Sequence, residues 1–327
     1  MQAETDRTAY LHMLWGSLAF ALMGAFGHAA GERCGWQWVA LARTTVAFLL
    51  AFLIARSAGV KLVLWGPRTL WIRSVAGSIG LLCNFYAITH LPVSDALTLM
   101  NTAPIWVTVL MWALFGQRPG AGTWLAVLLG VAGIVLMQQP HFESGVFAGL
   151  LALCGALCTS IAMLGLNRLQ SLDPRAIVTH FSGVSSFITI LFLLLTGGNA
   201  NIISPSGLRA FALLLLTGIF GVIGQMGLTL AFARGHAARV SVVSLSQILF
   251  ALILDLVIWR RSINLISVIG MILVAAPTAW LILHDVTRRA EQVNEDVHHH
   301  APLAGVEIVG YGQDKPHDRP PDAATND

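Results

Sequence analysis

A chain of 327 residues that is 56% hydrophobic and 11% charged is not expected to be a water-soluble protein, because soluble domains are about 45–50% apolar and about 25% charged. Its mean hydropathy of +0.74 supports the same conclusion. The net charge of +3 is small and the basic residues form no stripe along one helix face, so nucleic acid is not expected as a partner.

Ten apolar segments follow one another along the chain, each about long enough for a helix that crosses a hydrocarbon core of about 30 Å. They cover residues 10–30, 36–55, 71–90, 93–115, 122–138, 146–167, 176–196, 208–232, 240–259 and 265–284. Backbone polar groups find no partners in lipid, so runs of this length must be helical. The first segment resembles a signal peptide but is long enough to span, and we expect it to be retained. The predicted fold class is an all-α membrane protein with ten transmembrane helices.

The positions of Lys and Arg predict how the chain is oriented. Ten spans place both termini on one side; 14 of the 19 basic residues then lie on that side, four on the other, and Arg43 within a span. Basic loops remain in the cytoplasm. We therefore expect a multi-pass protein of the cell (inner) membrane with both termini cytoplasmic.

Small residues recur between the two halves of the chain. Gly77-x-x-Gly80 lies on the third segment and Gly221-x-x-Gly224 lies on the eighth, 144 residues later, and Gly130 of the fifth segment matches Gly270 of the tenth. Five helices per half is an odd number, so the second half must be inverted across the membrane, as in many secondary transporters. The predicted inverted repeats cover residues 8–140 and 145–285.

The composition changes at Asp285. From Asp285 onward the chain has four basic and nine acidic residues, three consecutive histidines from His298, and no apolar periodicity. Residues 286–327 are therefore predicted to be a disordered cytoplasmic tail. The histidine run could bind a metal weakly, but a solvated linker is favoured, and no metal site is predicted.

No motif indicates catalysis. There is no H-E-x-x-H, the stretch from His180 to Gly183 is not a G-x-S-x-G context, and no phosphate-binding loop exists that could drive transport with ATP. The cysteines form no C-x-x-C pair and no disulfide framework; they are Cys34, Cys83, Cys154 and Cys158. We expect neither an enzyme nor a cofactor.

A series of motifs in the first half resembles the drug/metabolite transporter superfamily, specifically a protein with two EamA-type repeats. These motifs are Trp15-Gly16-Ser17, Arg43, Tyr86-Ala87, Pro92-x-x-x-Ala96, Pro104 and Gly116-Gln117-Arg118-Pro119. The resemblance covers residues 8 to about 285. It implies ten helices, alternating access and a substrate site between the halves, but it does not imply which substrate.

The chain departs from this family in two places. The family often has Gly-Glu after the fourth and ninth helices, where this chain has Gly116-Gln117 and Arg260-Arg261. Pro104 frees a backbone carbonyl one turn earlier, near Asn101, and broken or kinked helices often mark transporter sites. The second half lacks a proline that would match Pro104. No role of those glutamates can be carried over.

Polar side chains inside lipid are costly, by about 2.5–3.5 kcal/mol for a charge, so such residues usually face a partner or a wet cavity. The candidate substrate-binding residues chosen on this basis, or from the resemblance, are Trp15, Ser17, Arg43, Asn84, Tyr86, Asn101, Gln225, Ser244 and Gln247. Interhelical hydrogen bonding is the alternative for the amides and hydroxyls. Core packing or contact with lipid is the alternative for the aromatic residues.

The ninth segment carries a polar face. Ser244, Gln247, Ala251 and Asp255 recur at helical spacing. A carboxylate in an apolar site takes up a proton readily, so Asp255 is a candidate for proton coupling or for pairing with Arg43. Alternatively, Asp255 meets the arginines at the membrane interface and Arg43 extends its charge toward water.

The function predicted from these features is secondary active transport, as an exporter or exchanger, of a small organic metabolite by alternating access. A non-transporting membrane scaffold or sensor is one alternative, and an intramembrane enzyme is another. The predicted partners are a small-molecule solute and the lipid bilayer. The solute, the direction, the coupling ion and the oligomeric state stay open.

Overall fold

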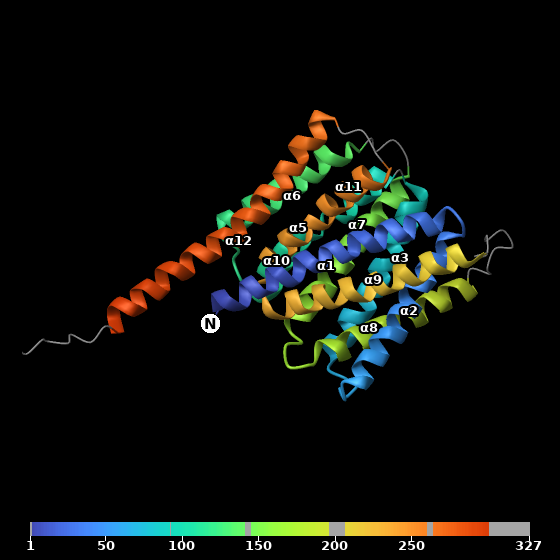
Figure 1. The fold of residues 1–327 in the computed structure, drawn as a ribbon, viewed down its shortest axis with the longest axis horizontal. Coiled ribbons are helices and arrows are strands. Elements are labelled where there is room, and N and C mark those ends of the chain that lie inside the picture. The colour runs from blue at the N-terminus through green and yellow to red at the C-terminus, as the bar shows by residue number, and fades with distance from the viewer. Residues whose placement is uncertain (1, 92, 141–144, 196–206, 260–263, 301–327) are drawn as a thin grey trace, which may run out of the picture. The chain divides into compact units, whose positions relative to one another are not determined.

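A computed structural model describes residues 2–91, 93–140, 145–195, 207–259 and 264–300. Two units are distinguished, Met1–Thr287 and Arg288–Asp327, and the first contains the helical bundle. The described residues form helices and no strand, which confirms the predicted all-α class (Figure 1). The helices are α1 (Gln2–Gly31), α2 (Trp36–Ser57), α3 (Arg68–His90), α4 (Val93–Met100), α5 (Ala103–Phe115), α6 (Ala121–Gln138), α7 (Val146–Asn167), α8 (Pro174–Leu195), α9 (Gly207–Arg234), α10 (Ala237–Ser244), α11 (Ser246–Trp259) and α12 (Leu265–His300).

These helices account for the ten predicted spans. Among the described residues, nine segments are long and apolar enough to cross a membrane. The tenth is α3, which is less apolar because it carries Arg73, Asn84 and two serines, yet it packs inside the bundle against α7 and α8. Most spans begin and end close to their predicted limits. The exceptions are α1, which begins at Gln2 instead of residue 10, and α12, which continues to His300, beyond the change of composition at Asp285.

Two spans are broken in the middle. The fourth consists of α4 and α5, which are separated at Asn101 and Thr102, and the ninth consists of α10 and α11, which are separated at Leu245. Pro104 in the first turn of α5 explains the first break, because proline has no N–H for the helical ladder. The second break has no proline and was not predicted. There the Ser244 hydroxyl donates to the Ser241 carbonyl at 2.6 Å, which competes with regular helix hydrogen bonding.

The two halves interlock through their first and third spans. In the first half α1 packs along α9, and in the second half α7 packs along α3; α2 lies against α8 and α9 (Figure 1). The first helix of each half therefore packs against the third span of the other half. This exchange is the arrangement expected of two inverted five-helix repeats.

Glycines permit both of these crossings. A Cβ added at Gly227 would lie 2.7 Å from the Cα of Gly16 and 2.7 Å from the His12 carbonyl. On the other side, a Cβ at Gly80 would lie 3.1 Å from the Gly155 carbonyl. The backbones thus touch directly, as in small-residue contacts between membrane helices.

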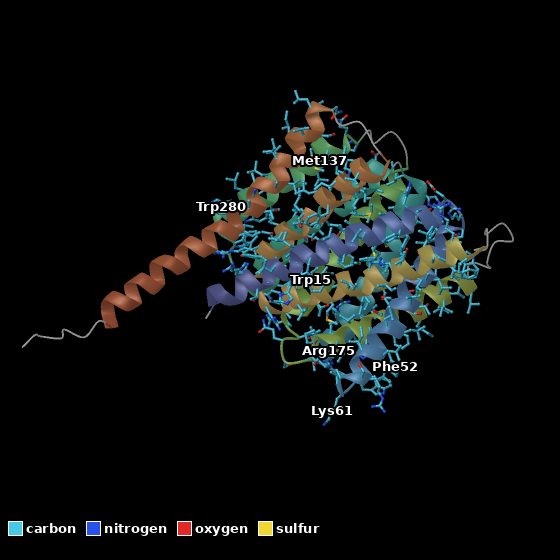
Figure 2. The ribbon with its side chains drawn as sticks, in the orientation of Figure 1. Trp15, Phe52, Lys61, Met137, Arg175 and Trp280 are labelled. Carbon is cyan, nitrogen blue, oxygen red and sulfur yellow. The ribbon has the colours of Figure 1, made fainter. Side chains whose placement is uncertain are left out.

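A third close contact joins the last spans of the two halves, α6 and α12. A Cβ at Gly133 would lie 2.7 Å from the Gly270 carbonyl, whereas Gly130 faces Leu245. Gly270 is thus packed against Gly133, whereas Gly130, its counterpart in the predicted repeat, contacts Leu245. Figure 2 places Met137 and Trp280 on these two helices. Leu128 and Ile272 are more than half exposed there, as expected of side chains that face lipid.

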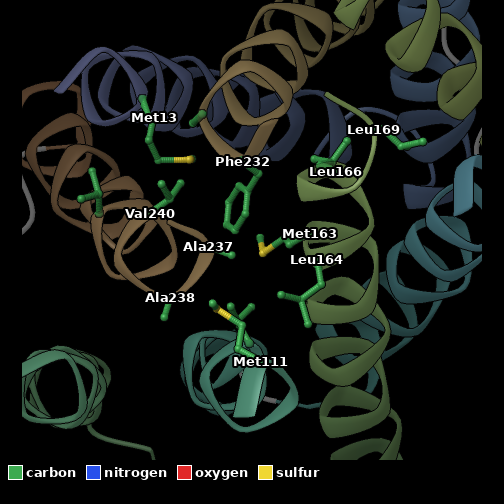
Figure 3. Close-up of a cluster of buried hydrophobic side chains, with 14 of the residues drawn as sticks. Met13, Met111, Met163, Leu164, Leu166, Leu169, Phe232, Ala237, Ala238 and Val240 are labelled. Carbon is green, nitrogen blue, oxygen red and sulfur yellow. The ribbon is translucent and has the colours of Figure 1, made fainter. Parts of the chain in front are cut away.

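One end of the bundle is closed by a large apolar cluster. We call it the N-side cluster, because it includes Ala9 and Tyr10 at the start of the first span. Its other members come from α1, α3, α5, α7, α8, α9 and α10 and from Leu169, which follows α7. The ring of Phe232 lies among Met163, Ala237 and their neighbours (Figure 3). Ile282 of α12 packs against the same cluster, so the ten spans begin and end at this end of the bundle.

Exposed basic residues surround the N-side cluster. Lys61 and Arg175, which Figure 2 shows at the same margin of the bundle, belong to this group. It also includes Arg7, Arg56, Arg68, Arg118, Arg168 and Arg234, all of them exposed. Arg33 and Arg209 are exposed at the opposite end. This grouping is the one on which the predicted orientation depends.

Candidate functional site

The two helix breaks are connected to the opposite half of the protein. The Ser160 hydroxyl of α7 contacts the Ala103 carbonyl at the first break, at 2.9 Å, and its own Ala156 carbonyl at 2.7 Å. The Ser17 hydroxyl of α1 donates to the Ser244 carbonyl at the second break, at 3.4 Å. A serine from the first helix of each half therefore supports the break in the other half.

Local side chains also donate to carbonyls next to the first break. The Asn101 amide donates to the Leu97 carbonyl at 2.7 Å, and the Thr102 hydroxyl donates to the Leu99 carbonyl at 2.6 Å. Such partners are required because an unpaired backbone group in an apolar interior is costly. Asn101 thus lies at the break as predicted, with one of its amide hydrogens already used.

A second group of predicted residues lies where α2 meets α9. Arg43 is partly buried, and its Cγ is 3.5 Å from the position that a Cβ would occupy at Gly221. Gln225 is one turn further along α9, on the same face, and is 7% exposed. The Asp255 side chain lies outside the described residues, so neither its pairing with Arg43 nor its proposed coupling role is tested.

The two predicted aromatic residues have different surroundings. The Trp15 side chain is 37% exposed, and its ring centroid is 6.1 Å from that of His12. Figure 2 labels Trp15 on α1. Tyr86 stacks on His90 with 3.8 Å between ring centroids and meets the edge of Phe147.

Two predicted amides remain. Asn84 packs against Gly155 of α7, and its Oδ1 is buried without a hydrogen-bond partner. Gln247 is partly buried in the first turn of α11, next to the second break. Asn84 and Gln247 therefore belong to the interfaces that involve α7 and the broken ninth span.

A further polar region, absent from the predicted site, lies between α3 and α8. Arg73 is 2% exposed, and its guanidinium lies 3.9 Å above the centre of the Phe181 ring. Beside it, the Ser74 hydroxyl and the His180 Nδ1 are 2.8 Å apart. Toward the middle of the bundle, the hydroxyls of Ser78 and Ser185 are 2.7 Å apart. Polar groups therefore line this interface over several turns.

A signal for this region was present in the sequence. Ser182, Ser185, Ser186 and Thr189 share one helical face, and all four are buried. Arg73 was counted as a charge on the loop side, because hydropathy gives the depth of a residue but not the helix that it faces. Among the described residues, no group of three or more His, Cys, Asp or Glu side chains could hold a metal ion.

Comparison with known proteins gives a consistent result. The model of the EamA-like transporter family matches residues 7–138 and 146–283, and each of these blocks contains five of the ten spans. The pseudopaline exporter CntI of Pseudomonas aeruginosa is 26% identical over 276 residues, which cover 84% of this chain and 95% of the relative. The riboflavin transporter of Vibrio cholerae is 23% identical over 240 residues, covering 70% and 78%.

The fold also has a counterpart among solved structures. One crystal structure of another protein superposes with a TM-score of 0.73 at 18% sequence identity. The match covers 83% of this chain and 96% of that chain. At this level of identity the likeness concerns the fold alone.

Proposed function

Because the chain belongs to the EamA-like transporter family, we propose that it is a secondary active transporter that moves a small organic metabolite by alternating access between its two halves. The observation that carries this proposal is the pair of broken spans, each supported by a serine of the other half. Irregular backbone at membrane depth is tolerated where it is buried in protein or lines a wet cavity, and transporters use it to bind solutes.

The proposed solute site lies between the two breaks. Ser17, Asn101, Ser244 and Gln247 belong to the breaks, while Arg43 and Gln225 approach from the contact between α2 and α9. Amides can both donate and accept hydrogen bonds, so this set suits a polar organic solute. Trp15, Asn84 and Tyr86 are further candidates, and packing between helices is their alternative role.

The N-side cluster is the proposed gate. Its side chains from both halves are tightly packed, so a solute cannot pass this end until α9 and α10 separate from α5 and α7. Because exposed basic residues surround this end, we place it in the cytoplasm, with both termini there and the protein in a bacterial inner membrane. The described conformation is then closed toward the cytoplasm.

The relatives do not select one solute. One is named as an exporter of pseudopaline and another as a transporter of riboflavin, and the two differ in chemistry. The transported compound is therefore best identified by counterflow into proteoliposomes loaded with amino acids, nucleotide sugars, organic cations or riboflavin. We expect at least one class to exchange.

Two variants make this experiment specific. Replacement Gln247→Leu removes a polar group at the second break and is expected to lower counterflow at least about tenfold, if the amide contributes a hydrogen bond of about 1.5 kcal/mol to solute binding. Ser57→Ala, on the exposed end of α2, is the matched control.

In the same assay Asp255→Asn tests proton coupling. An unchanged pH dependence of counterflow removes that role for Asp255. The absence of exchange for every class, with correctly inserted protein, contradicts the transporter proposal.

A further inference from the structure

Arg73 is a buried charge without a counter-charge. It lies in the second turn of α3, and its stem packs on Gly165 of α7, where an added Cβ would be 2.9 Å from the arginine Cβ. Within the described part of the chain no carboxylate pairs with it, and its Nε and Nη1 have no hydrogen-bond partners. The guanidinium lies over the face of the Phe181 ring, 3.9 Å from its centre.

His180 adds a second unsatisfied group to the same place. The residue is 7% exposed, and its Nδ1 is engaged by the Ser74 hydroxyl, while its Nε2 has no hydrogen-bond partner. The ring is held edge-on by Trp71, with 4.8 Å between centroids. The imidazole is thus fixed in orientation among Ser74, Trp71 and the Leu64 backbone, and its Nε2 has no side-chain partner.

The chemistry of these groups specifies what is missing. A guanidinium stays protonated and carries five N–H donors, so burial cannot neutralise it. Contact with an aromatic face satisfies the flat side of the ion but leaves its N–H edge unsatisfied. Leaving a buried charge unpaired is strongly unfavourable. An oxyanion at the edge of Arg73 would supply both the missing counter-charge and the missing hydrogen-bond acceptors. Arg pairs with carboxylate and phosphate groups through parallel N–H···O bonds.

We propose that the interface between α3 and α8 is a binding site for an oxyanion, a phosphate or carboxylate group held by the Nε and Nη1 of Arg73 and by the Nε2 of His180. Both residues lie in the second turn of their helices, about 10 Å or less from the N-side ends at about 1.5 Å per residue. At this depth the oxyanion can come from a lipid headgroup or from solution. The site does not involve the two helix breaks.

Binding can be measured without any transport assay. Purified full-length protein in neutral detergent is heated with inorganic phosphate, with acetate or with chloride at equal ionic strength, and separately in nanodiscs of phosphatidylglycerol or phosphatidylcholine. We expect a higher midpoint of thermal unfolding with phosphate or acetate, or with phosphatidylglycerol. Stabilisation by the soluble anions indicates a soluble ligand, and stabilisation by phosphatidylglycerol alone indicates a lipid headgroup.

Two variants and a control connect this response to the proposed site. Arg73→Gln is expected to abolish the anion-dependent rise while raising the basal midpoint, since it removes an unpaired buried charge. His180→Gln is expected to reduce the rise by at least half, and it keeps the experiment interpretable if the arginine variant does not accumulate. Arg56→Gln makes the same charge change on an exposed side chain at the same end and should respond like the parent. No stabilisation by any anion, or equal loss in Arg56→Gln, overturns the proposal, whatever the outcome for transport.

Discussion

Single glycines determine how closely the helices of this protein approach one another. Gly16 and Gly227 bring the backbones of α1 and α9 into contact, and no flexible side chain is available there to move aside. By contrast, Gly24 on α1 has no atom within 4 Å of the position that its Cβ would take. The same residue type therefore has a packing role at one position and none at the other.

Alanine substitution should separate these two roles. Gly227→Ala forces a methyl group into backbone atoms and is expected to cost about 1–3 kcal/mol, as overpacked cores do. Gly24→Ala should be neutral or stabilising by up to about 1 kcal/mol, because alanine favours helix more than glycine does. The measurement is the midpoint of thermal unfolding of the two purified variants in one detergent. Equal midpoints would show that the close contact has no energetic consequence.

At the scale of whole elements, the span limits were predictable and the internal breaks only in part. Apolar run length sets where a helix meets the membrane boundary, so the ends of α2, α6 and α7 were predicted closely. Pro104 indicated the first break, because proline has no backbone N–H and its ring clashes with the preceding helical turn. The break at Leu245 depends on serine hydroxyls that bond to nearby carbonyls, and serines that do so have the same sequence pattern as serines that do not.

The hydroxyl of Ser160 gives a test at this scale. Ser160→Ala leaves the Ala103 carbonyl without its partner from α7 and should destabilise the protein by less than about 1 kcal/mol, as measured for interhelical hydrogen bonds in membranes. The effect should be local, with faster amide hydrogen exchange in the first turn of α5 and unchanged exchange in α2. Ser57→Ala, which loses only an exposed bond to Ile54, should leave exchange in α5 unaltered. Uniformly faster exchange throughout the bundle would argue against a local role.

The molecule as a whole has two unlike ends. One end carries the N-side cluster and most of the exposed arginines, and the opposite end carries Arg33 and Arg209. The ten-span bundle and the inverted relation of its halves were predicted from the number of apolar segments and the distribution of charge. The contacts of Arg73 and His180 were not, because they depend on which helices face each other, and the polar face of α8 does not indicate that its partner is α3.

Labelling of introduced cysteines tests the orientation of these ends. A membrane-impermeant maleimide applied to intact cells should label Arg209→Cys and should label Lys61→Cys only after the cells are permeabilised. Native Cys34 should contribute little background, because it is 1% exposed and burial raises the pKa of its thiol, which disfavours the reactive thiolate. The reverse labelling pattern would place the N-side cluster outside the cell.

The exchange of first helices between the halves has a consequence for biosynthesis. When only the first five spans have been synthesised, the glycine-bearing face of α3 cannot yet pack against α7, and α1 cannot yet pack against α9. The nascent first half therefore cannot complete its native contacts until α7 and then α9, which forms the eighth span, enter the bilayer. Both halves thus reach their native packing only after most of the second half has been inserted.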